Sequence, residues 1–324
     1  MLGTDIHGLL CSEAAVYSEL PLVKSLIFGF SWKYLSKLSC GMERSFLYID
    51  MLKGLRQNIL RAVSRMNNTA DSRGLANKLF QTYIAPIIEH YNPIISPLAS
   101  HYGSTLYRAR KCTADTEYTS IKDLLNPPSP SGRAVSSDAQ SILYASSSLQ
   151  SCKAELDLKI GDLVNIVGLD YTEISSQPFW FIGQLAAFHK SKEPSHYVSE
   201  RNGLDVTAYF SHDAQQSFIY QDALINEIFS TISSPTDGYS LNRYLIEAIY
   251  KKLPKDPALA GVVYLSVKDA PGINFAIFGD AISKLKIGQL NSIRVTDIDD
   301  YGTVGYRLLK NGSLKDQQII WRDV

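Results

Sequence analysis

Residues 104–110, Ser-Thr-Leu-Tyr-Arg-Ala-Arg, alternate apolar and basic side chains, and this alternation predicts a β-strand. The apolar runs 141–146 and 162–169 predict two more short strands. Residues 147–158, between those two runs, predict a helix that bears Glu155. Strands and a helix in this mixed order are typical of an α+β fold.

Three side chains of chemical interest follow the loop 126–132, which is rich in Pro and Ser. They are Arg133, Tyr144 and Glu155, separated by two equal steps of eleven residues. An arginine fork matches phosphate oxygens, an aromatic ring stacks on a flat base, and a carboxylate stabilises a developing positive charge. The three together suit a ligand that has phosphates, a base and a cleavable sugar bond, as dinucleotides such as NAD have.

The region before this stretch is predicted to be helical. Apolar residues recur at helical spacing over residues 48–66, and a second helix is expected to begin at Asp71 or Ser72. Pro86 is expected to kink or break this second helix. We therefore divide the chain into a helical N-terminal region, residues 1–103, and a catalytic region, residues 104–324. The helices are interpreted as a layer packed on the catalytic region, and a partner-binding module is the alternative.

The end of the chain is predicted to form three strands, over residues 292–296, 303–309 and 317–321. Asn311-Gly312 is the sequence most typical of a two-residue hairpin turn, so a turn is predicted there. The order of helices and strands is mixed along the chain, and the fold class that we expect is α+β. Further helices are predicted over residues 217–232 and 241–249, and further strands over residues 261–266 and 274–278.

Composition argues against several classes of function. The 32 basic and 32 acidic side chains give a formal net charge of zero, whereas nucleic-acid binding usually shows as a basic excess. Lys24 and Lys33 interrupt the apolar run 20–35, so no membrane span is expected. No signal peptide is recognised at the start, and a cytoplasmic location is expected.

The sequence contains no motif typical of a metal site or of a nucleotide-binding loop. The four cysteines and six histidines show none of the spacings that zinc sites use, so no metal is expected. The chain also lacks the glycine-rich dinucleotide fingerprint, the phosphate-binding loop of nucleotide triphosphatases and the nucleophile elbow of α/β-hydrolases.

An ordered set of short pieces spans residues 106–278. The pieces are Leu106-Tyr107-Arg108, Pro127-Pro128, Gly132-Arg133, Leu143-Tyr144-Ala145, Glu155, Tyr239-Ser240-Leu241-Asn242, Gly261-Val262-Val263-Tyr264-Leu265-Ser266, Gly272-Ile273-Asn274 and Ile277-Phe278. In content and order this set resembles the RES-domain family, which is named for Arg, Glu and Ser. The resemblance covers about residues 105–280, somewhat over half of the chain.

This resemblance implies a fold similar to ADP-ribosyltransferases and an activity that consumes NAD, commonly as the toxin of a toxin–antitoxin pair. It implies catalytic roles for Glu155, Arg133 and Ser266. It implies NAD-binding roles for Arg108, Arg133, Tyr144 and Tyr239, with Arg110 as the alternative to Arg108. The chain departs from the family in its long N-terminal region and in a long segment between Arg108 and Arg133.

The sequence is therefore compatible with three functions. The first is an enzyme that cleaves the nicotinamide–ribose bond of NAD by hydrolysis or phosphorolysis, with an antitoxin protein as its expected partner. The second is an ADP-ribosyltransferase that modifies a protein. The third is a non-catalytic binding module with a RES-like fold, which the presence of Arg133 and Glu155 disfavours.

Overall fold

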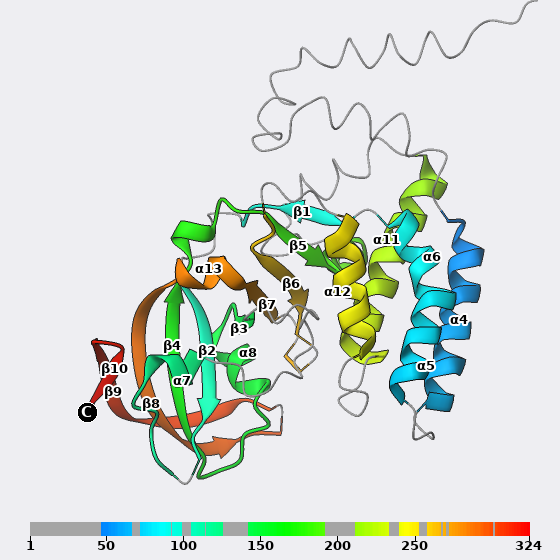
Figure 1. Cartoon of the computed structure of the whole chain (residues 1–324). Helices are drawn as coiled ribbons and strands as arrows, with labels where there is room; N and C mark the ends of the chain where they lie inside the picture. The colour runs from blue at the N-terminus through cyan, green and yellow to red at the C-terminus, as the bar shows by residue number, and fades with distance from the viewer. Residues whose placement is uncertain are drawn as a thin grey trace, which may run out of the picture. The chain divides into compact units, whose positions relative to one another are not determined.

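The computed structural model describes residues 47–66, 72–91, 93–98, 105–113, 115–125, 142–191, 211–232, 240–252, 258–266, 268–269, 272–300 and 302–324. All of these residues belong to one compact unit, Leu47–Val324. Helices and a large sheet form this unit, which confirms the predicted α+β class (Figure 1).

The described strands form one ten-stranded sheet in the order β1-β5-β6-β7-β3-β2-β4-β8-β9-β10. β5 and β6 run parallel, and the other neighbouring strands are antiparallel. The strands are β1 Ile94–Ser96, β2 Thr105–Lys111, β3 Ile142–Ser146, β4 Leu163–Asp170, β5 Phe179–Ile182, β6 Gly261–Leu265, β7 Ile273–Phe278, β8 Lys286–Ile298, β9 Val304–Lys315 and β10 Gln318–Asp323.

The helices lie before and between these strands, so the predicted mixed order is observed. The longer α-helices are α4 Ile49–Met66, α5 Ser72–Leu79, α9 Gln184–Ser191, α11 His212–Glu227 and α12 Ser240–Lys252. The shorter ones are α6 Ala85–His90, α7 Ile121–Leu125, α8 Leu149–Ala154 and α13 Gly279–Ser283, with a 3-10 turn η3 Thr172–Ile174 and two π-helical turns, η2 Phe80–Ile84 and η4 Ile228–Ile232.

The sheet is weakly joined at its centre. β2 and β3 share one register pair, Tyr107 opposite Ser146, whereas β2 pairs with β4 from Thr105 to Lys111. β3 in turn pairs with β7 along its whole length. The two halves of the sheet therefore separate on either side of this single pair.

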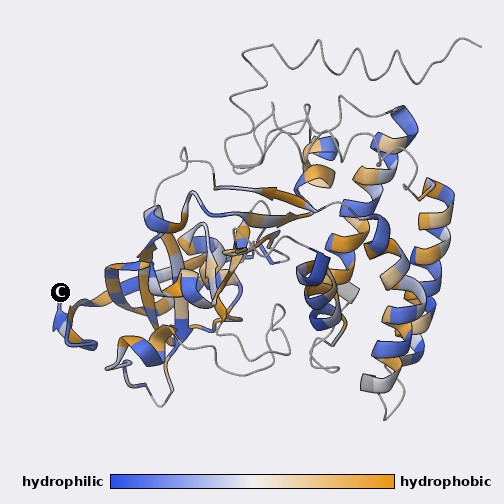
Figure 2. Cartoon of the chain, turned by 45° about the horizontal axis from the view of Figure 1, so that its top comes forward, coloured by the Kyte–Doolittle hydropathy of each residue, from blue (hydrophilic) through white to orange (hydrophobic). Residues whose placement is uncertain are grey.

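Alternation along the strands gives each face of the sheet its own core. Tyr144 and Val262 lie on one face, here called face A, and Leu143 and Val263 lie on the other, face B. On face A, helices α4, α5, α6, α11 and α12 cover one half of the sheet, and α8 covers the other half. Helices α7 and α13 cover face B. Bands of hydrophobic and hydrophilic residues alternate along the long helices, as this packing requires (Figure 2).

Pro86 neither breaks nor ends the helical path. The helix continues through a π-helical turn, Phe80–Ile84, and Pro86 stands in the first turn of α6. A proline inside a helical path lacks an N–H donor and its ring clashes with the preceding turn, and a π-helical turn gives the local adjustment that accommodates it. The wider π-helical turn is marked by a hydrogen bond from the Ala85 N–H to the Phe80 carbonyl.

The predicted hairpin turn at Asn311-Gly312 is wrong, because both residues lie inside β9. The turn falls at Asp316 and Gln317, which both have positive φ, 48° and 66°. Gly312 is needed for another reason. A Cβ there would lie 2.8 Å from the Leu290 Cβ and 2.9 Å from the Trp321 Cζ3. Packing, rather than turn geometry, therefore explains this glycine.

Replacing Gly312 by Ala should lower the free energy of unfolding by about 1–3 kcal/mol, because the new methyl group overpacks the contact between β8 and β10. Gly54→Ala, in the exposed part of α4 where a Cβ meets nothing within 4 Å, should instead stabilise by about 0.5–1 kcal/mol. Urea denaturation of both variants measures the two changes. Equal stability of the variant Gly312→Ala and the parent would contradict the packing argument.

A buried carboxylate ties the helical layer to the sheet. Asp222 on α11 accepts hydrogen bonds from the Gly183 N–H at 3.0 Å, the Ala186 N–H at 3.1 Å and the Tyr91 hydroxyl at 3.3 Å. Burial raises the pKa of Asp222 to about 6, and the backbone N–H groups oppose this rise. Asp222 thus connects α11 to the end of β5, the start of α9 and the end of α6 through one side chain.

A carboxyl whose folded pKa lies above its ordinary value, 3.8 here, stabilises the fold at low pH and loses that contribution as the pH rises through the folded value. We therefore expect the stability of the parent relative to Asp222→Asn to fall by up to about 3 kcal/mol between about pH 4 and pH 7. Denaturant midpoints across this range measure it. Asp213→Asn, an exposed position on the same helix, should keep the pH dependence of the parent.

Candidate functional site

Two of the residues predicted to be catalytic are hydrogen-bonded to each other. The Ser266 hydroxyl donates to Glu155 Oε1 at 2.8 Å. The Asn274 amide Nδ2 donates to the same oxygen at 2.7 Å. Asn274 Oδ1 accepts a hydrogen bond from the Ser146 hydroxyl at 2.6 Å. We call these four residues the Glu155 cluster.

The sheet brings three members of this cluster to one end of face A. Ser146 ends β3, and it lies opposite Asn274 on β7. Ser266 follows β6, and its backbone N–H donates to the Gly272 carbonyl at 2.8 Å, which extends the β6–β7 ladder by one step. Because alternate residues of a strand share a face, Ser266 points to the same side as Val262 and Tyr264.

Glu155 reaches the cluster from α8. The Ser148 side chain caps the N-terminus of α8 by accepting from the Ser151 N–H at 3.0 Å. Glu155 is the residue after the last helical turn, with φ −67° and ψ −16°. The predicted helix 147–158 is therefore shorter than expected, and Glu155 stands at its end rather than within it. α8 packs on β2 and β3, so Glu155 is held where the two halves of the sheet meet.

The loop between β6 and β7 is attached at three points to α8 and the residues that follow it. Besides Ser266 and Glu155, the Ser151 hydroxyl donates to Asp269 Oδ2 at 2.5 Å, and Lys268 forms an ion pair with Asp157. Gly272 permits this approach, since a Cβ there would lie 2.2 Å from the Ser151 Oγ. The loop and the helix therefore behave as one support for the Glu155 carboxylate.

The Ser266 hydroxyl is hydrogen-bonded to three neighbouring residues. Its Oγ accepts from the Asp269 N–H at 3.1 Å and from the Lys268 N–H at 3.3 Å, while its own hydrogen points to Glu155. This arrangement orients the carboxylate rather than freeing the hydroxyl for a bond to a ligand. Glu155 Oε2, in contrast, accepts no hydrogen bond from any residue that the structure describes.

Arg108, on β2, bridges to β3 and α7. Its Nη1 donates to the Tyr144 carbonyl at 2.8 Å, and its Nε donates to the Leu124 carbonyl at 3.0 Å. Burial, and to a smaller extent the charge of Arg110, lower the pKa of Arg108 to about 10. The side chain is still protonated at neutral pH, and it joins β3 and α7 to β2 where the backbone ladder stops.

Tyr144 and Arg110 take different positions. Tyr144 lies on face A, two residues before Ser146, and is half-buried against the helical side of the core. Arg110 is half-buried, with its guanidinium carbon 4.9 Å from the centre of the Tyr118 ring, and it donates to the Asp123 carbonyl. Alternation places Arg110 on face B with Arg108. Arg133 and Tyr239 lie outside the described residues.

Sequence reasoning assigned no role to Asn274 or Ser146. The signal for Asn274 was present, since it is the one polar residue in the run Ile-Asn-Phe-Ala-Ile-Phe of β7. A polar side chain in a buried strand needs a hydrogen-bond partner, so it points to other polar groups nearby. Ser146 carried no comparable signal, because serine is ordinary at the end of a strand.

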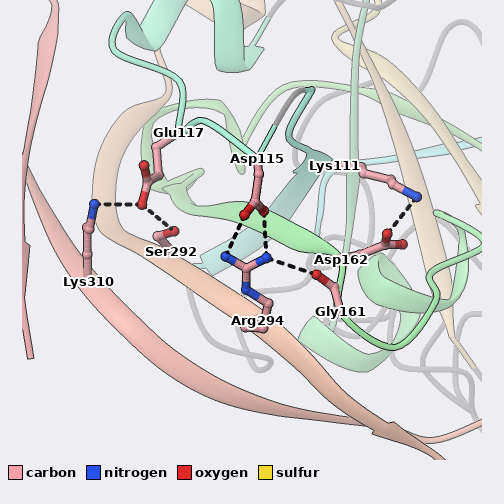
Figure 3. A network of polar contacts seen from close by, with 8 residues as sticks. All are labelled: Lys111, Asp115, Glu117, Gly161, Asp162, Ser292, Arg294 and Lys310. Carbon is pink, nitrogen blue, oxygen red and sulfur yellow. Dashed lines mark hydrogen bonds and ion pairs between the residues drawn. The ribbon is translucent and has the colours of Figure 1, made fainter.

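A second polar cluster holds the segment 115–120 across β4, β8 and β9 (Figure 3). Arg294 pairs with Asp115 at 2.5 Å, and Lys310 pairs with Glu117 at 2.8 Å. Glu117 also accepts from the Ser292 hydroxyl at 3.4 Å. Opposite charges are matched one to one in this cluster, so it is best explained as the attachment of a connecting segment to the sheet.

Although burial opposes ionisation of Glu117, the hydrogen bond from Lys310 holds its pKa below the ordinary 4.5. The stabilisation is therefore present above pH 4.5 and is lost as the pH falls through the lower folded value. We expect Glu117→Gln to lower the free energy of unfolding by about 0.5–1 kcal/mol at neutral pH and by less in acid. Thermal melts at neutral pH and in acid measure this difference. The control is Glu173→Gln, which removes an exposed ion pair with Lys286.

Other classes of site receive no support from the described residues. They contain no group of three or more His, Cys, Asp or Glu side chains that could hold a metal ion. No helix in this part of the chain is long and apolar enough to cross a membrane. Burial raises the pKa of the Cys152 thiol to about 12, so it is not a reactive thiolate.

Comparisons with known proteins give no relative from which a role could be transferred: no family model, no curated protein and no solved structure matches this chain.

Proposed function

We propose that this chain cleaves the nicotinamide–ribose bond of NAD and thereby degrades it. The observation that carries the proposal is the Glu155 carboxylate, which is fixed through Oε1 by Ser266 and Asn274 and has no described partner at Oε2. A carboxylate that is held in place by buried donors is suited to a developing positive charge. The resemblance to RES-domain proteins supplies the substrate.

The bond to be broken joins the ribose C1′ to the nicotinamide nitrogen. Its electron pair leaves with nicotinamide, and positive charge develops on the ribose as in glycoside cleavage. Glu155 would stabilise that charge or accept a hydrogen bond from a ribose hydroxyl. Water or phosphate then attacks C1′ and loses a proton, giving ADP-ribose or its phosphate ester.

Placement supports further roles for two predicted residues. Tyr144 shares face A with the Glu155 cluster, which suits stacking on a ring that enters at this end. Arg108 would act mainly by holding β2 and β3 at a fixed separation, since two of its donors are bound to backbone carbonyls. Arg133 is proposed to bind the pyrophosphate, and Tyr239 the nucleotide, on the resemblance alone.

On this proposal the chain is the toxin of a toxin–antitoxin pair, and an antitoxin protein would restrain it. Expression of the chain alone would then lower cellular NAD and stop growth. Both expectations rest on the resemblance and on the same carboxylate.

The purified full chain should release nicotinamide from NAD, and Glu155→Gln should lower the rate at least about 100-fold, because the neutral amide cannot balance the developing charge. Ser266→Ala, which removes one hydrogen bond to the carboxylate, should lower it about 10-fold. Liquid chromatography of nicotinamide measures both.

Glu173→Gln is the matched control, since Glu173 lies in an exposed ion pair with Lys286 on another part of the chain. It should keep the parental rate. Mass analysis of the products separates ADP-ribose, its phosphate ester and a modified protein. A parent that binds NAD without releasing nicotinamide would sink the proposal, as would a Glu155→Gln variant with full activity.

A further inference from the structure

The side chain of Asn274 is buried and hydrogen-bonded at both its amide nitrogen and its amide oxygen. It is 4% exposed, and both ends of its amide are hydrogen-bonded within the Glu155 cluster. Burying an amide on a strand of otherwise apolar residues is costly unless both ends find partners. The cost is met here only because Ser146 and Glu155 reach the same point of face A.

The direction of these hydrogen bonds is set by Glu155. An ionised carboxylate can only accept, so the Asn274 amide must turn its NH₂ group to Glu155 and its carbonyl to Ser146. The Ser146 hydroxyl then donates to that carbonyl. The result is a chain of donors, from Ser146 through Asn274 to Glu155, in which each group leaves the next one a single orientation.

Both donors that reach Glu155 end on the same oxygen. Ser266 and Asn274 bind Oε1 at 2.8 Å and 2.7 Å. Hydrogen bonds to a charged group are stronger than those between neutral groups, so two of them fix the plane of the carboxylate. Oε2 is thereby the oxygen that remains for another partner.

We infer that Asn274 is a positioning residue of the proposed reaction: with Ser266 it reserves Oε1 of Glu155 and presents Oε2 to the ribose of the substrate. The inference rests on the proposed function for the identity of the substrate. The hydrogen-bonded arrangement that it invokes is independent of that function. Ser146 belongs to the same device, because its hydroxyl keeps the amide of Asn274 in the productive orientation.

The test uses the full chain and two variants. Asn274→Leu removes the donor at similar size, and Ser146→Ala removes the hydroxyl that orients it. We expect kcat to fall about 10-fold or more in Asn274→Leu and by a smaller factor in Ser146→Ala, with KM for NAD within about twofold of the parent in both. Asn165→Leu is the matched control, since Asn165 is another buried sheet asparagine that binds the Tyr118 N–H instead. It should lower the melting temperature and keep the parental kcat.

A second measurement does not depend on activity. The side-chain amide signal of Asn274 should shift in ¹⁵N-correlated spectra when Glu155 is replaced by Ala. The signal is assigned by its absence in Asn274→Leu, or in Asn274→Ser where the leucine variant does not fold. The amides of Asn165 and Asn242 should move much less.

An unchanged kcat in Asn274→Leu, or an Asn274 amide that does not respond to Glu155→Ala, would overturn the inference. If the parent releases no nicotinamide, the proposed function fails, while the amide spectra still decide whether Asn274 holds Glu155.

Discussion

The single register pair between β2 and β3 is the constraint on which the rest of this structure depends. Backbone hydrogen bonds hold every other junction of the sheet over several residues, but here they stop after Tyr107 and Ser146. Arg108 takes over where they stop, by donating to the carbonyls of Tyr144 and Leu124. A buried guanidinium is costly in itself, and its bonds to carbonyls make it tolerable. α8 packs over this junction on face A, and Glu155 follows its last turn.

The Glu155 cluster combines residues from distant parts of the chain, and each arrives by a different physical route. α8 delivers Glu155 through a capped N-terminus and a helix end. The β6–β7 hairpin delivers Ser266 and Asn274 through strand alternation. Gly272 lets the hairpin loop approach the helix closely enough for the parts to meet. Such a site is rigid because its members are attached to regular elements and to each other.

Much of the architecture follows from the sequence, because hydrophobic periodicity reports which residues must be buried. β2, β3, β4, β6 and β7 lie within a residue or two of their predicted bounds, as does α4. The contact between Glu155 and Ser266 could not be derived from periodicity, since their separation of 111 residues is closed only by sheet topology. The resemblance named both residues, but it gave no indication that they touch.

The failure at Asn311-Gly312 has a physical reason. Turn propensity is local, and here it competes with the register of a long hairpin that packs Trp321 over Gly312. The paired register places Asp316 and Gln317 at positive φ instead, a conformation that aspartate adopts more readily than glutamine does. Tertiary packing thus overrides the strongest local signal in the tail. Local preference is also overridden at Pro86, where the helix continues through a π-helical turn instead of ending.

The position of Asn311 inside β9 also bears on the chemical ageing of this protein. An asparagine followed by glycine loses its amide nitrogen readily in flexible chains, because the glycine nitrogen can attack the side-chain carbonyl and close a five-membered ring. That attack needs a bent backbone. Asn311 is held extended between Asn291 on β8 and Arg322 on β10, and Gly312 is held with it. The pairing that prevents a turn at Asn311-Gly312 therefore also protects the side-chain amide of Asn311. Unfolding of the tail would expose this amide to slow, irreversible deamidation.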